Sequence, residues 1–340
     1  MYIDSRKIIM LLVLILGILA FEAKEYWADK KRGNKRKEDD KELHNSPERP
    51  KGKVDVVIDT DTFNEIDDQY ALAYLIKSED KLDLKAIYAA PFLNSKVKSA
   101  KEGMEKSRDE ILNILSLMKR DDLKSMVYSG SENFMKDEQT PIISDAAKDL
   151  AERAMSYTKE NPLYVIGIAA ITDVSSALLI NPEIKDRIVV VWLGGHGQDY
   201  KDTAEFNMKQ DIAAARILFG CGVRLVQLPC KGVVSSFTTT GPELEHWLKG
   251  KNELCDYLVE VTEKEAKAHH KEKTWSRPIW DVTAVAWLLD AKFMDERIIK
   301  SPIPEYDNTY SFNENRHDIK YVYYIYRDRL FEDLFKKLSS

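Results

Sequence analysis

Cysteine is scarce in this sequence, whose 340 residues include only Cys221, Cys230 and Cys255. Their odd number and wide spacing fit neither a disulfide framework nor the paired cysteines of a zinc site. We therefore predict three buried free thiols, because a free cysteine behaves as a small apolar residue. A bridge between Cys221 and Cys230 is an alternative that nothing else in the sequence supports.

An excess of positive charge is also absent. The formal net charge is -6 at pH 7, from 51 Lys and Arg residues against 57 Asp and Glu residues. Nucleic acid is therefore excluded as the main partner, because phosphate binding requires a basic surface. The chain is 44% hydrophobic and 10% aromatic, which is enough to bury a large core and excludes general disorder.

The apolar run at residues 8–21 is too short for a comfortable membrane span, which needs about 20 residues. It has the length of a signal-peptide core, so we predict a signal peptide or membrane anchor at 1–23 and a secreted or membrane-anchored, extracytoplasmic protein. Basic residues between 24 and 37 argue the other way, because positive flanks tend to remain cytoplasmic. The charged stretch 24–52 predicts a disordered linker.

Beyond residue 52, apolar strands alternate with amphipathic helices. Residues 54–58 form a short continuous apolar run, as a parallel strand buried on both faces does. Further strands are predicted at 84–89, 126–128, 163–168, 187–193, 224–228 and 321–325, and helices at 67–76, 98–118, 145–158, 173–180, 211–219, 253–270, 281–289 and 328–338. This alternation predicts one α/β domain over 53–340, an open, mostly parallel sheet with helices on both faces and a Rossmann-like core.

Four aspartates crowd the end of the first strand: Asp59 and Asp61 follow it directly, and Asp67 and Asp68 open the next helix. Ligands of open α/β sheets bind beyond the carboxyl ends of the strands, and like charges this close require neutralisation. Carboxylate oxygens suit a hard divalent cation, and calcium accepts irregular carboxylate cages more readily than magnesium. Helix capping is the plain alternative, but it accounts for one aspartate and not for four.

Two later segments place polar residues near other strand ends. Glu205 and Asn207 follow the strand 187–193, and Asp281 opens an apolar helix. Taken singly, Asp281 fits a helix N-cap equally well, and Glu205 and Asn207 fit solvated loop residues equally well.

With these segments in place, the chain resembles the inosine-uridine preferring nucleoside hydrolase family. The resemblance covers about residues 54–290 and keeps the family's order of motifs, which makes the set specific although each motif alone is weak. The motifs are Asp59-Thr60-Asp61 with Asp67-Asp68, Ile171-Thr172-Asp173 with Ala177-Leu178 and Asn181-Pro182-Glu183, Gly194-Gly195, Glu205-Phe206-Asn207 with Asp211 and Ala213-Ala214, and Asp281 with Ala284-Val285-Ala286.

The resemblance implies hydrolysis of the N-glycosidic bond of ribonucleosides, which releases ribose and a nucleobase, with Ca²⁺ as cofactor and a role in nucleoside salvage. Asp61, Asp68, Asp281 and the backbone carbonyl of Thr172 would hold the calcium ion, and Asp59 would support them. Asp61 would also be the general base that takes a proton from the attacking water.

The resemblance further implies that Asp67 holds the ribose 2′-hydroxyl, Glu205 and Asn207 the other hydroxyls, and Asn94 another part of the ribose. These residue types also suit the chemistry independently. N-glycoside hydrolysis passes through an oxocarbenium-like state, and nearby carboxylates stabilise its positive charge.

The sequence departs from the family pattern in three places. The acidic loop between Asp61 and Asp67 is two residues longer than usual. Trp280 stands where many members have a histidine that serves the leaving base, and a tryptophan can stack on a base, which suggests a purine preference. After the glycine turn, His196 is present where the family has Gly-Asn; it follows a strand end and could touch the leaving group, although a single loop histidine is more often a surface residue.

Two other functions stay open. A catalytically weak, calcium-dependent nucleoside or sugar-binding protein would keep the acidic cage but lose the help to the leaving group. A phosphatase of the haloacid-dehalogenase type would use Asp59-Thr60-Asp61-Thr62, but the Gly-Asp loop it needs is not found. The expected partner is a small ribonucleoside, and a homo-oligomer stays open.

Overall fold

The computed structural model of this chain describes residues 47–269 and 274–340. The predicted leader at 1–23 and the predicted linker up to residue 46 lie outside the described residues. Pro47–Ser340 form one compact unit. No helix in the described part is both long and apolar enough to cross a membrane.

Arg49 attaches the first described stretch to this unit. Its guanidinium donates a hydrogen bond of 2.8 Å to Glu296 Oε2 and lies 4.9 Å from the ring centroid of Trp287. The folded unit therefore begins a few residues before the predicted boundary at 53, because this charge is paired and stacked against the core.

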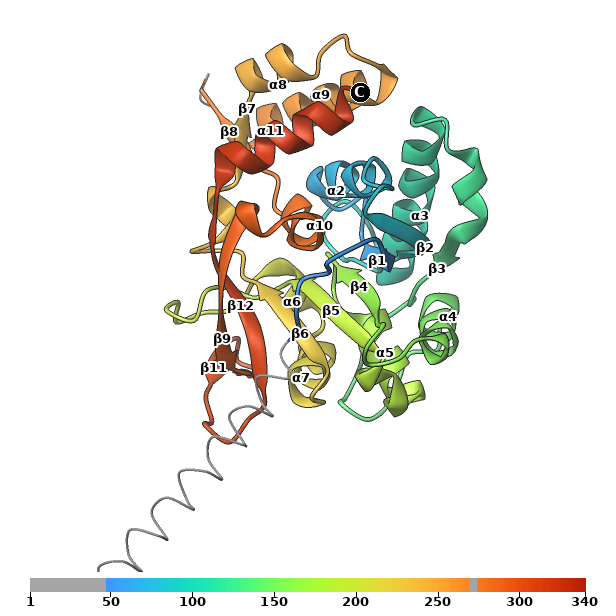
Figure 1. Cartoon of the computed structure of the whole chain (residues 1–340), viewed down its shortest axis with the longest axis vertical. Coiled ribbons are helices and arrows are strands. Elements are labelled where there is room, and N and C mark those ends of the chain that lie inside the picture. Colours follow the sequence, from blue (N-terminus) through green and yellow to red (C-terminus); the bar gives the residue numbers. More distant parts are fainter. Residues whose placement is uncertain (1–46, 270–273) are drawn as a thin grey trace, which may run out of the picture. The chain divides into compact units, whose positions relative to one another are not determined.

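An eight-stranded sheet forms the centre of the unit (Figure 1), with the strand order β3-β2-β1-β4-β5-β6-β12-β9. Its members are β1 (Val54–Thr60), β2 (Leu82–Ala89), β3 (Val127–Ser129), β4 (Leu163–Gly167), β5 (Ile188–Leu193), β6 (Arg224–Leu228), β9 (Met294–Lys300) and β12 (Asp318–Ile325). All neighbours pair in parallel except β12 and β9. The six strands from β3 to β6 have the Rossmann order, with β1 and β4 at the reversal point. The predicted open, mostly parallel sheet is thus confirmed.

Side chains alternate along each strand between two hydrophobic clusters, one on each face of the sheet. In β1, Val56 and Ile58 belong to one cluster and Val57 to the other. The first cluster is covered by α2 (Asp67–Ile76), α3 (Ala100–Leu117), α9 (Glu253–His269), α10 (Val282–Leu289) and α11 (Arg327–Leu338), and the second by α4 (Asp145–Arg153), α5 (Thr172–Ile180) and α7 (Ile212–Gly220). Burial on both faces explains why these strands are continuous apolar runs.

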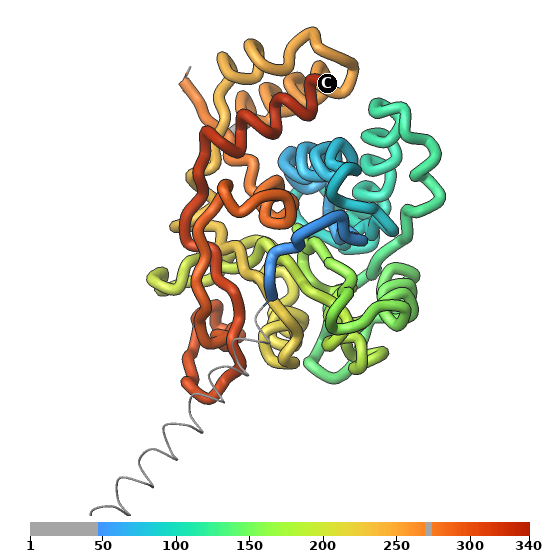
Figure 2. Tube along the Cα trace, in the orientation of Figure 1, coloured from blue at the N-terminus to red at the C-terminus, as the bar shows by residue number. Residues whose placement is uncertain are grey.

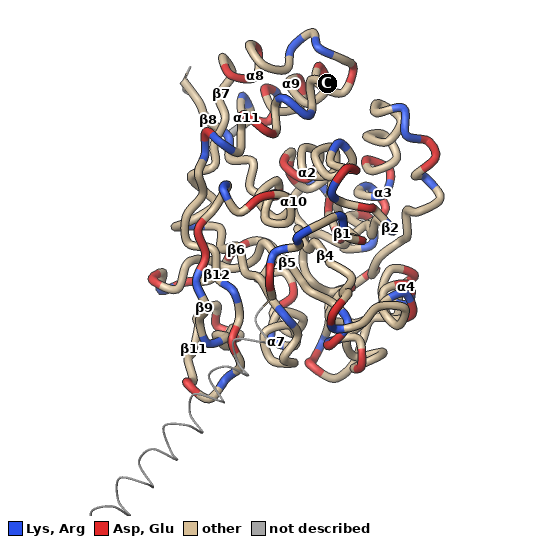
Figure 3. The backbone as a smooth tube through the Cα atoms, viewed as in Figure 1, with Lys and Arg blue, Asp and Glu red and all other residues tan. Residues whose placement is uncertain are grey.

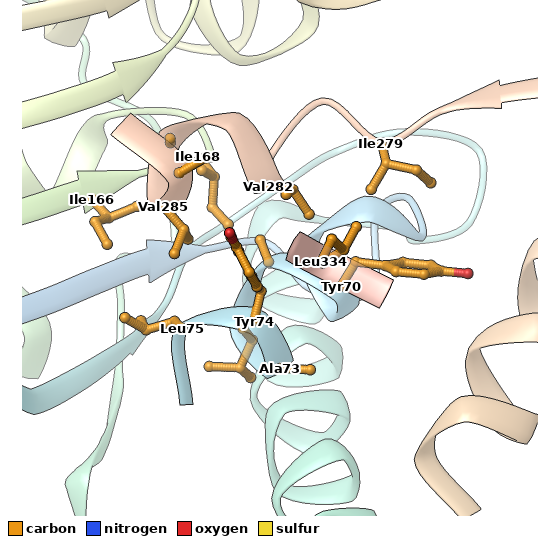
Figure 4. Packing of buried hydrophobic residues seen from close by; sticks show 14 of the residues in the cluster. Tyr70, Ala73, Tyr74, Leu75, Ile166, Ile168, Ile279, Val282, Val285 and Leu334 are labelled. Carbon is orange, nitrogen blue, oxygen red and sulfur yellow. The ribbon is translucent and has the colours of Figure 1, made fainter. Parts of the chain in front are cut away.

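Helices α2 and α10 pack against each other, α10 also contacts β4, and this packing sets the position of the site. Figure 4 shows Tyr70 and Leu75 of α2 beside Val282 and Val285 of α10, with Ile166 of β4 nearby. All five side chains are fully buried, and each contributes about 1.5–3 kcal/mol through burial of apolar surface. The first turns of both helices are therefore held rigidly.

The C-terminal part closes one side of the unit, where β12 and β9 extend the sheet and α11 lies beside α8 and α9 (Figure 2). The smaller elements are α6 (Phe206–Gln210), α8 (Gly241–Trp247), the antiparallel pairs β7 (Thr238–Thr240) with β8 (Ser276–Pro278) and β10 (Ile303–Pro304) with β11 (Tyr310–Ser311), and the 3₁₀ turns Asp121–Met126, Ala154–Ser156, Pro182–Asp186, Val234–Ser236 and Ala291–Phe293.

One predicted helix is too long, and one strand of the main sheet was not predicted. The helix at 145–158 ends at Arg153 and continues as the 3₁₀ turn Ala154–Ser156. The strand β9 was not predicted, because an edge strand is partly exposed and Met294–Lys300 mixes charged and apolar residues. All three cysteines are free thiols, as predicted, but only Cys255 is buried, whereas Cys221 and Cys230 are partly exposed.

Lys and Arg residues are intermixed with Asp and Glu residues over the helices and loops of the unit (Figure 3). Many of these charges pair locally, as in the 2.8 Å contact between Arg153 and Asp149 on α4. A group of buried carboxylates without a cationic partner would differ from this pattern and would need a separate explanation.

Candidate active site

A pocket of about 230 Å³ opens at the reversal point of the sheet, beyond the carboxyl ends of β1, β4 and β5. The chain leaves β1 and β4 in opposite directions along the sheet, so a crevice forms between their connections. The pocket is lined by Asp61, Asn64, Glu65, Asp67, Asp68, Ile168, Leu193, His196, Ala204, Glu205, Phe206, Asn207, Cys230, Lys231, Trp280 and Asp281.

Three carboxylates meet at the base of this pocket. Asp67, Asp68 and Asp281 each place an oxygen within 4.8 Å of the other two, and all three are buried. Asp67 and Asp68 belong to the first turn of α2, and Asp281 immediately precedes α10. Neither helix start has a side-chain capping hydrogen bond, so the capping interpretation is wrong for this cluster.

Burial and mutual repulsion disfavour the ionised form of these carboxylates and raise their pKa values. Burial, followed by repulsion from Asp68, raises the pKa of Asp67 to about 7. Burial also raises the pKa of Asp68 to about 7, although the hydroxyl of Thr60 donates a 2.5 Å hydrogen bond to its Oδ1. The pKa of Asp281 lies well above its usual range because of burial and then the charges of Asp67, Asp68 and Asp61.

The same residues fit a hard divalent cation. Among the residues that the structure describes, both carboxylate oxygens of Asp59 and the Oδ2 atom of Asp61 are buried without a hydrogen-bond partner. Burial with the charges of Asp68 and Asp67 raises the pKa of Asp61 well above its usual range. A cation would neutralise this cluster, and an all-oxygen donor set is the kind that Ca²⁺ and Mg²⁺ bind.

Glu205 is a buried helix cap rather than a solvated loop residue. Its carboxylate accepts hydrogen bonds from the backbone N–H groups of Asn207 and Met208, both at 2.9 Å, and from Gly195 at 3.0 Å. Asn207 Nδ2 in turn donates a 3.1 Å hydrogen bond to the carbonyl of Leu193. The glycine turn after β5 and the start of α6 are therefore locked together at the pocket wall.

Gly195 is required in that turn. Its φ of +76° disfavours any side chain, and a Cβ would lie 2.1 Å from the Tyr310 hydroxyl and 2.7 Å from Met208. A hydrogen bond of 3.0 Å from Gln227 holds the Tyr310 hydroxyl in place.

Two predicted site residues do not line the pocket. Asn94 donates a 2.8 Å hydrogen bond from Nδ2 to Oδ1 of Asn64, which is a lining residue. Thr172 is fully buried at the start of α5, and its hydroxyl donates a 2.7 Å hydrogen bond to Asp211. The structure thus brings Asp61, Asp67, Asp68, Asp281, Glu205, Asn207, Trp280 and His196 to one pocket, with Asn94 one contact behind it.

The sequence model of the inosine-uridine preferring nucleoside hydrolase family matches residues 56–320 of this chain. The chain belongs to this family. The predicted recognition and the predicted class of enzyme, an N-ribohydrolase, are confirmed by this match. No curated protein shows a significant sequence match.

Solved nucleoside hydrolases share the fold. A plant nucleoside hydrolase superposes with a TM-score of 0.68 at 17% identity, covering 84% of this chain and 99% of that one. A purine-preferring ribonucleoside hydrolase from Gardnerella vaginalis gives 0.67 at 19% identity, covering 84% and 98%. An inosine-uridine preferring nucleoside hydrolase from Bacillus anthracis gives 0.62 at 16% identity, covering 85% and 99%.

Within this nucleoside hydrolase, Trp280 and its neighbours form one side of the pocket. The indole Nε1 of Trp280 donates a 3.5 Å hydrogen bond to Ser235 Oγ. Arg277 lies 5.8 Å from the indole centroid and donates a 3.1 Å hydrogen bond to Glu265 on α9. The half-buried indole therefore has a fixed orientation and offers an aromatic surface to the pocket.

Four polar or thiol residues of this nucleoside hydrolase's pocket were not predicted to belong to it: Asn64, Glu65, Cys230 and Lys231. Asn64 and Glu65 lie in the loop that is two residues longer than the family pattern, and that length difference was an available signal. Cys230 and Lys231 follow β6, so the strand-end rule applied to β6 would have found them.

Proposed function

We propose that this protein hydrolyses the N-glycosidic bond of ribonucleosides in a calcium-dependent reaction, with a preference for purine nucleosides. The observation that carries the proposal is the meeting of Asp67, Asp68 and Asp281 beside Asp61, in the same pocket as Glu205 and Asn207. One part of this pocket suits a cation, and the other suits a polyhydroxylated sugar.

These roles are the ones that the resemblance to the family implies, and the presence of Asp61, Asp68 and Asp281 in one pocket is consistent with them. Asp61, Asp68 and Asp281 would hold the ion, with the carbonyl of Thr172 as a further ligand and Asp59 behind them. A bound calcium ion balances the cluster's negative charge and lowers the pKa of a water molecule. Asp61, whose Oδ2 has no hydrogen-bond partner among the described residues, takes the proton from the attacking water.

Asp67, Glu205 and Asn207 bind the ribose hydroxyls, for which charge-assisted hydrogen bonds to carboxylates are well suited. Glu205 keeps its position through three backbone N–H donors. The negative charge around the sugar also stabilises the oxocarbenium-like state. Asn94 contributes by holding Asn64 at the pocket wall.

The proposed purine preference rests on Trp280. Its fixed indole provides a stacking surface, and a larger base gains more from stacking than a smaller one. A structural neighbour carries the description purine-preferring ribonucleoside hydrolase, which is consistent with this preference.

Trp280 also favours a second candidate, a calcium-dependent nucleoside or sugar-binding protein with weak activity. A tryptophan cannot act as a proton donor to the leaving base as a histidine can. The haloacid-dehalogenase alternative is wrong, because the chain belongs to the nucleoside hydrolase family.

One assay tests the proposal and the second candidate together. Full-length protein is incubated with inosine, guanosine, adenosine and uridine, in EGTA and after addition of Ca²⁺ or Mg²⁺, and released ribose is measured. Ribose release that EGTA abolishes and Ca²⁺ restores supports the hydrolase. Calcium-dependent nucleoside binding in calorimetry without turnover supports the binding protein.

Replacement of Asp61 tests the proposed base. Asp61→Asn should lower kcat by at least about 100-fold, the lower range for loss of a general base, while circular dichroism shows an unchanged fold. A rate near that of the wild type would refute this role for Asp61. The predicted leader at 1–23 would place the reaction outside the cytoplasm, and fractionation of producing cells tests that placement.

A further inference from the structure

His196 lies on a rigid extension of the sheet at the pocket wall. Beyond the ends of β5 and β6 the two backbones remain hydrogen-bonded. The N–H of Cys230 donates to the carbonyl of Gly195 at 2.8 Å, and the N–H of Gly197 donates to the carbonyl of Lys231 at 3.0 Å. His196 therefore lies between two backbone contacts that fix its Cα position.

The imidazole ring is fixed as well. Its Nδ1 atom accepts a hydrogen bond of 3.3 Å from the backbone N–H of Lys231. The residue is only 4% exposed, and it lines the pocket. In a neutral imidazole one nitrogen accepts and the other donates, so Nε2 carries the proton.

The groups around His196 favour this neutral form. Burial and then the charge of Lys231 lower the pKa of His196, while Asp202 and the carbonyl of Gly195 act in the opposite direction. At pH 7 the residue is therefore a neutral hydrogen-bond donor rather than a cationic acid.

The leaving group of the proposed reaction needs such a donor. When the C–N bond of a ribonucleoside breaks, the electron pair moves to the base, which departs as an anion unless it is protonated, and a hydrogen-bond donor stabilises that negative charge. Trp280 cannot supply this help from its Nε1–H, which already donates to Ser235. Among the described residues that line this pocket, the one histidine is His196.

We propose that His196 is a catalytic residue that donates a hydrogen bond from Nε2 to an acceptor atom of the departing nucleobase. This inference rests on the proposed N-ribohydrolase function and names the group that recognises the leaving base. Water attacks C1′ and gives its proton to Asp61, the C–N electron pair goes to the base, and the base then takes a proton from solvent. His196 holds its own proton throughout.

Two types of substrate test this role. Inosine has a poor leaving group that needs a hydrogen bond, whereas p-nitrophenyl β-D-ribofuranoside releases a stable phenolate without help. The variants are His196→Phe, which keeps a ring without nitrogen, and His196→Gln, which retains an N–H donor. His246→Phe is the matched control, because His246 is an exposed residue of α8 that packs on Trp247 outside the pocket.

His196→Phe should lower kcat/KM for inosine by about 10- to 100-fold, the effect of one hydrogen bond to a developing charge. Its activity on p-nitrophenyl β-D-ribofuranoside should stay close to that of the wild type, and His196→Gln should recover part of the loss on inosine. Thermal unfolding of each variant confirms that it is folded. The ratio of wild-type to His196→Phe activity on inosine should not fall between pH 6 and 9.

Equal losses on both substrates would overturn the inference, because they would show a general disturbance of the pocket. No loss on inosine, or a ratio that collapses as the pH rises, would also overturn it. Wild-type protein that releases ribose from neither substrate would refute the proposed function itself. Wild-type turnover of both substrates without a selective loss in His196→Phe would refute only the role of His196.

Discussion

Replacement of Asp68 by asparagine is expected to stabilise the metal-free protein and to weaken its binding of calcium. Asp68 is fully buried beside Asp67 and Asp281, and folding raises its pKa from 3.8 to about 7. Asparagine has the same shape and can still accept the hydrogen bond from Thr60, but it carries no charge. The substitution therefore removes one of the repelling charges and leaves the packing unchanged.

The sign of the pH dependence follows from the raised pKa of Asp68. A group of this kind stabilises the fold fully below the unfolded pKa near 3.8, and this stability is lost as the pH rises through about 7. Because each tenfold change in the proton affinity of the carboxylate is worth about 1.4 kcal/mol, the loss is about 4 kcal/mol. For a domain of this size, the corresponding change in Tm is on the order of 10 °C.

Thermal unfolding monitored by circular dichroism tests this reasoning in four conditions, pH 5 and pH 8, each with EDTA and with Ca²⁺. In EDTA at pH 8, Asp68→Asn should melt above the wild type, and at pH 5 the difference should shrink. Calcium at 100 times its Kd should raise the wild-type stability by about 2.7 kcal/mol and the variant's by much less.

Asp328→Asn is the matched control, because that side chain is 93% exposed and its charge should have little effect under any of these conditions. The reasoning is refuted if Asp68→Asn is no more stable than the wild type in EDTA at pH 8. It is also refuted if calcium stabilises both proteins equally.

Four further substitutions probe the pocket wall. Trp280→Ala should lower kcat/KM for inosine by about 10- to 100-fold, the loss of one base–aromatic stack, and should affect uridine less; equal effects on both nucleosides would contradict the proposed purine preference. Gly195→Ala should reduce the free energy of unfolding by about 1–3 kcal/mol in denaturant titrations, because its Cβ would meet the Tyr310 hydroxyl at 2.1 Å; unchanged stability would contradict the requirement for glycine. Asn94→Ala should raise KM for inosine less than Asn64→Ala does, because Asn94 acts through Asn64; a larger effect of Asn94→Ala in steady-state kinetics would indicate direct contact with the sugar.

Local sequence patterns were sufficient for the central strands and for the two acidic helix starts. The apolar run that forms β1 ends directly in Asp59 and Asp61, and α2 begins with Asp67 and Asp68. These features could be predicted because a strand buried on both faces has a continuous apolar sequence. The edge strand β9 could not, because partial exposure removes that pattern.

The sequence by itself determined which residue types stand at the ends of the strands, and hence the chemistry that is available to the site. Tertiary structure decided which of them meet: Asp281 joins Asp67 because α10 packs on α2, and Lys231 fixes the ring of His196 because β5 and β6 are neighbours. It also decided that Glu205 is a buried cap rather than a solvated residue. Such contacts join residues that are far apart in the chain. They depend on strand order and helix packing, so the local pattern of apolar and polar residues cannot predict them.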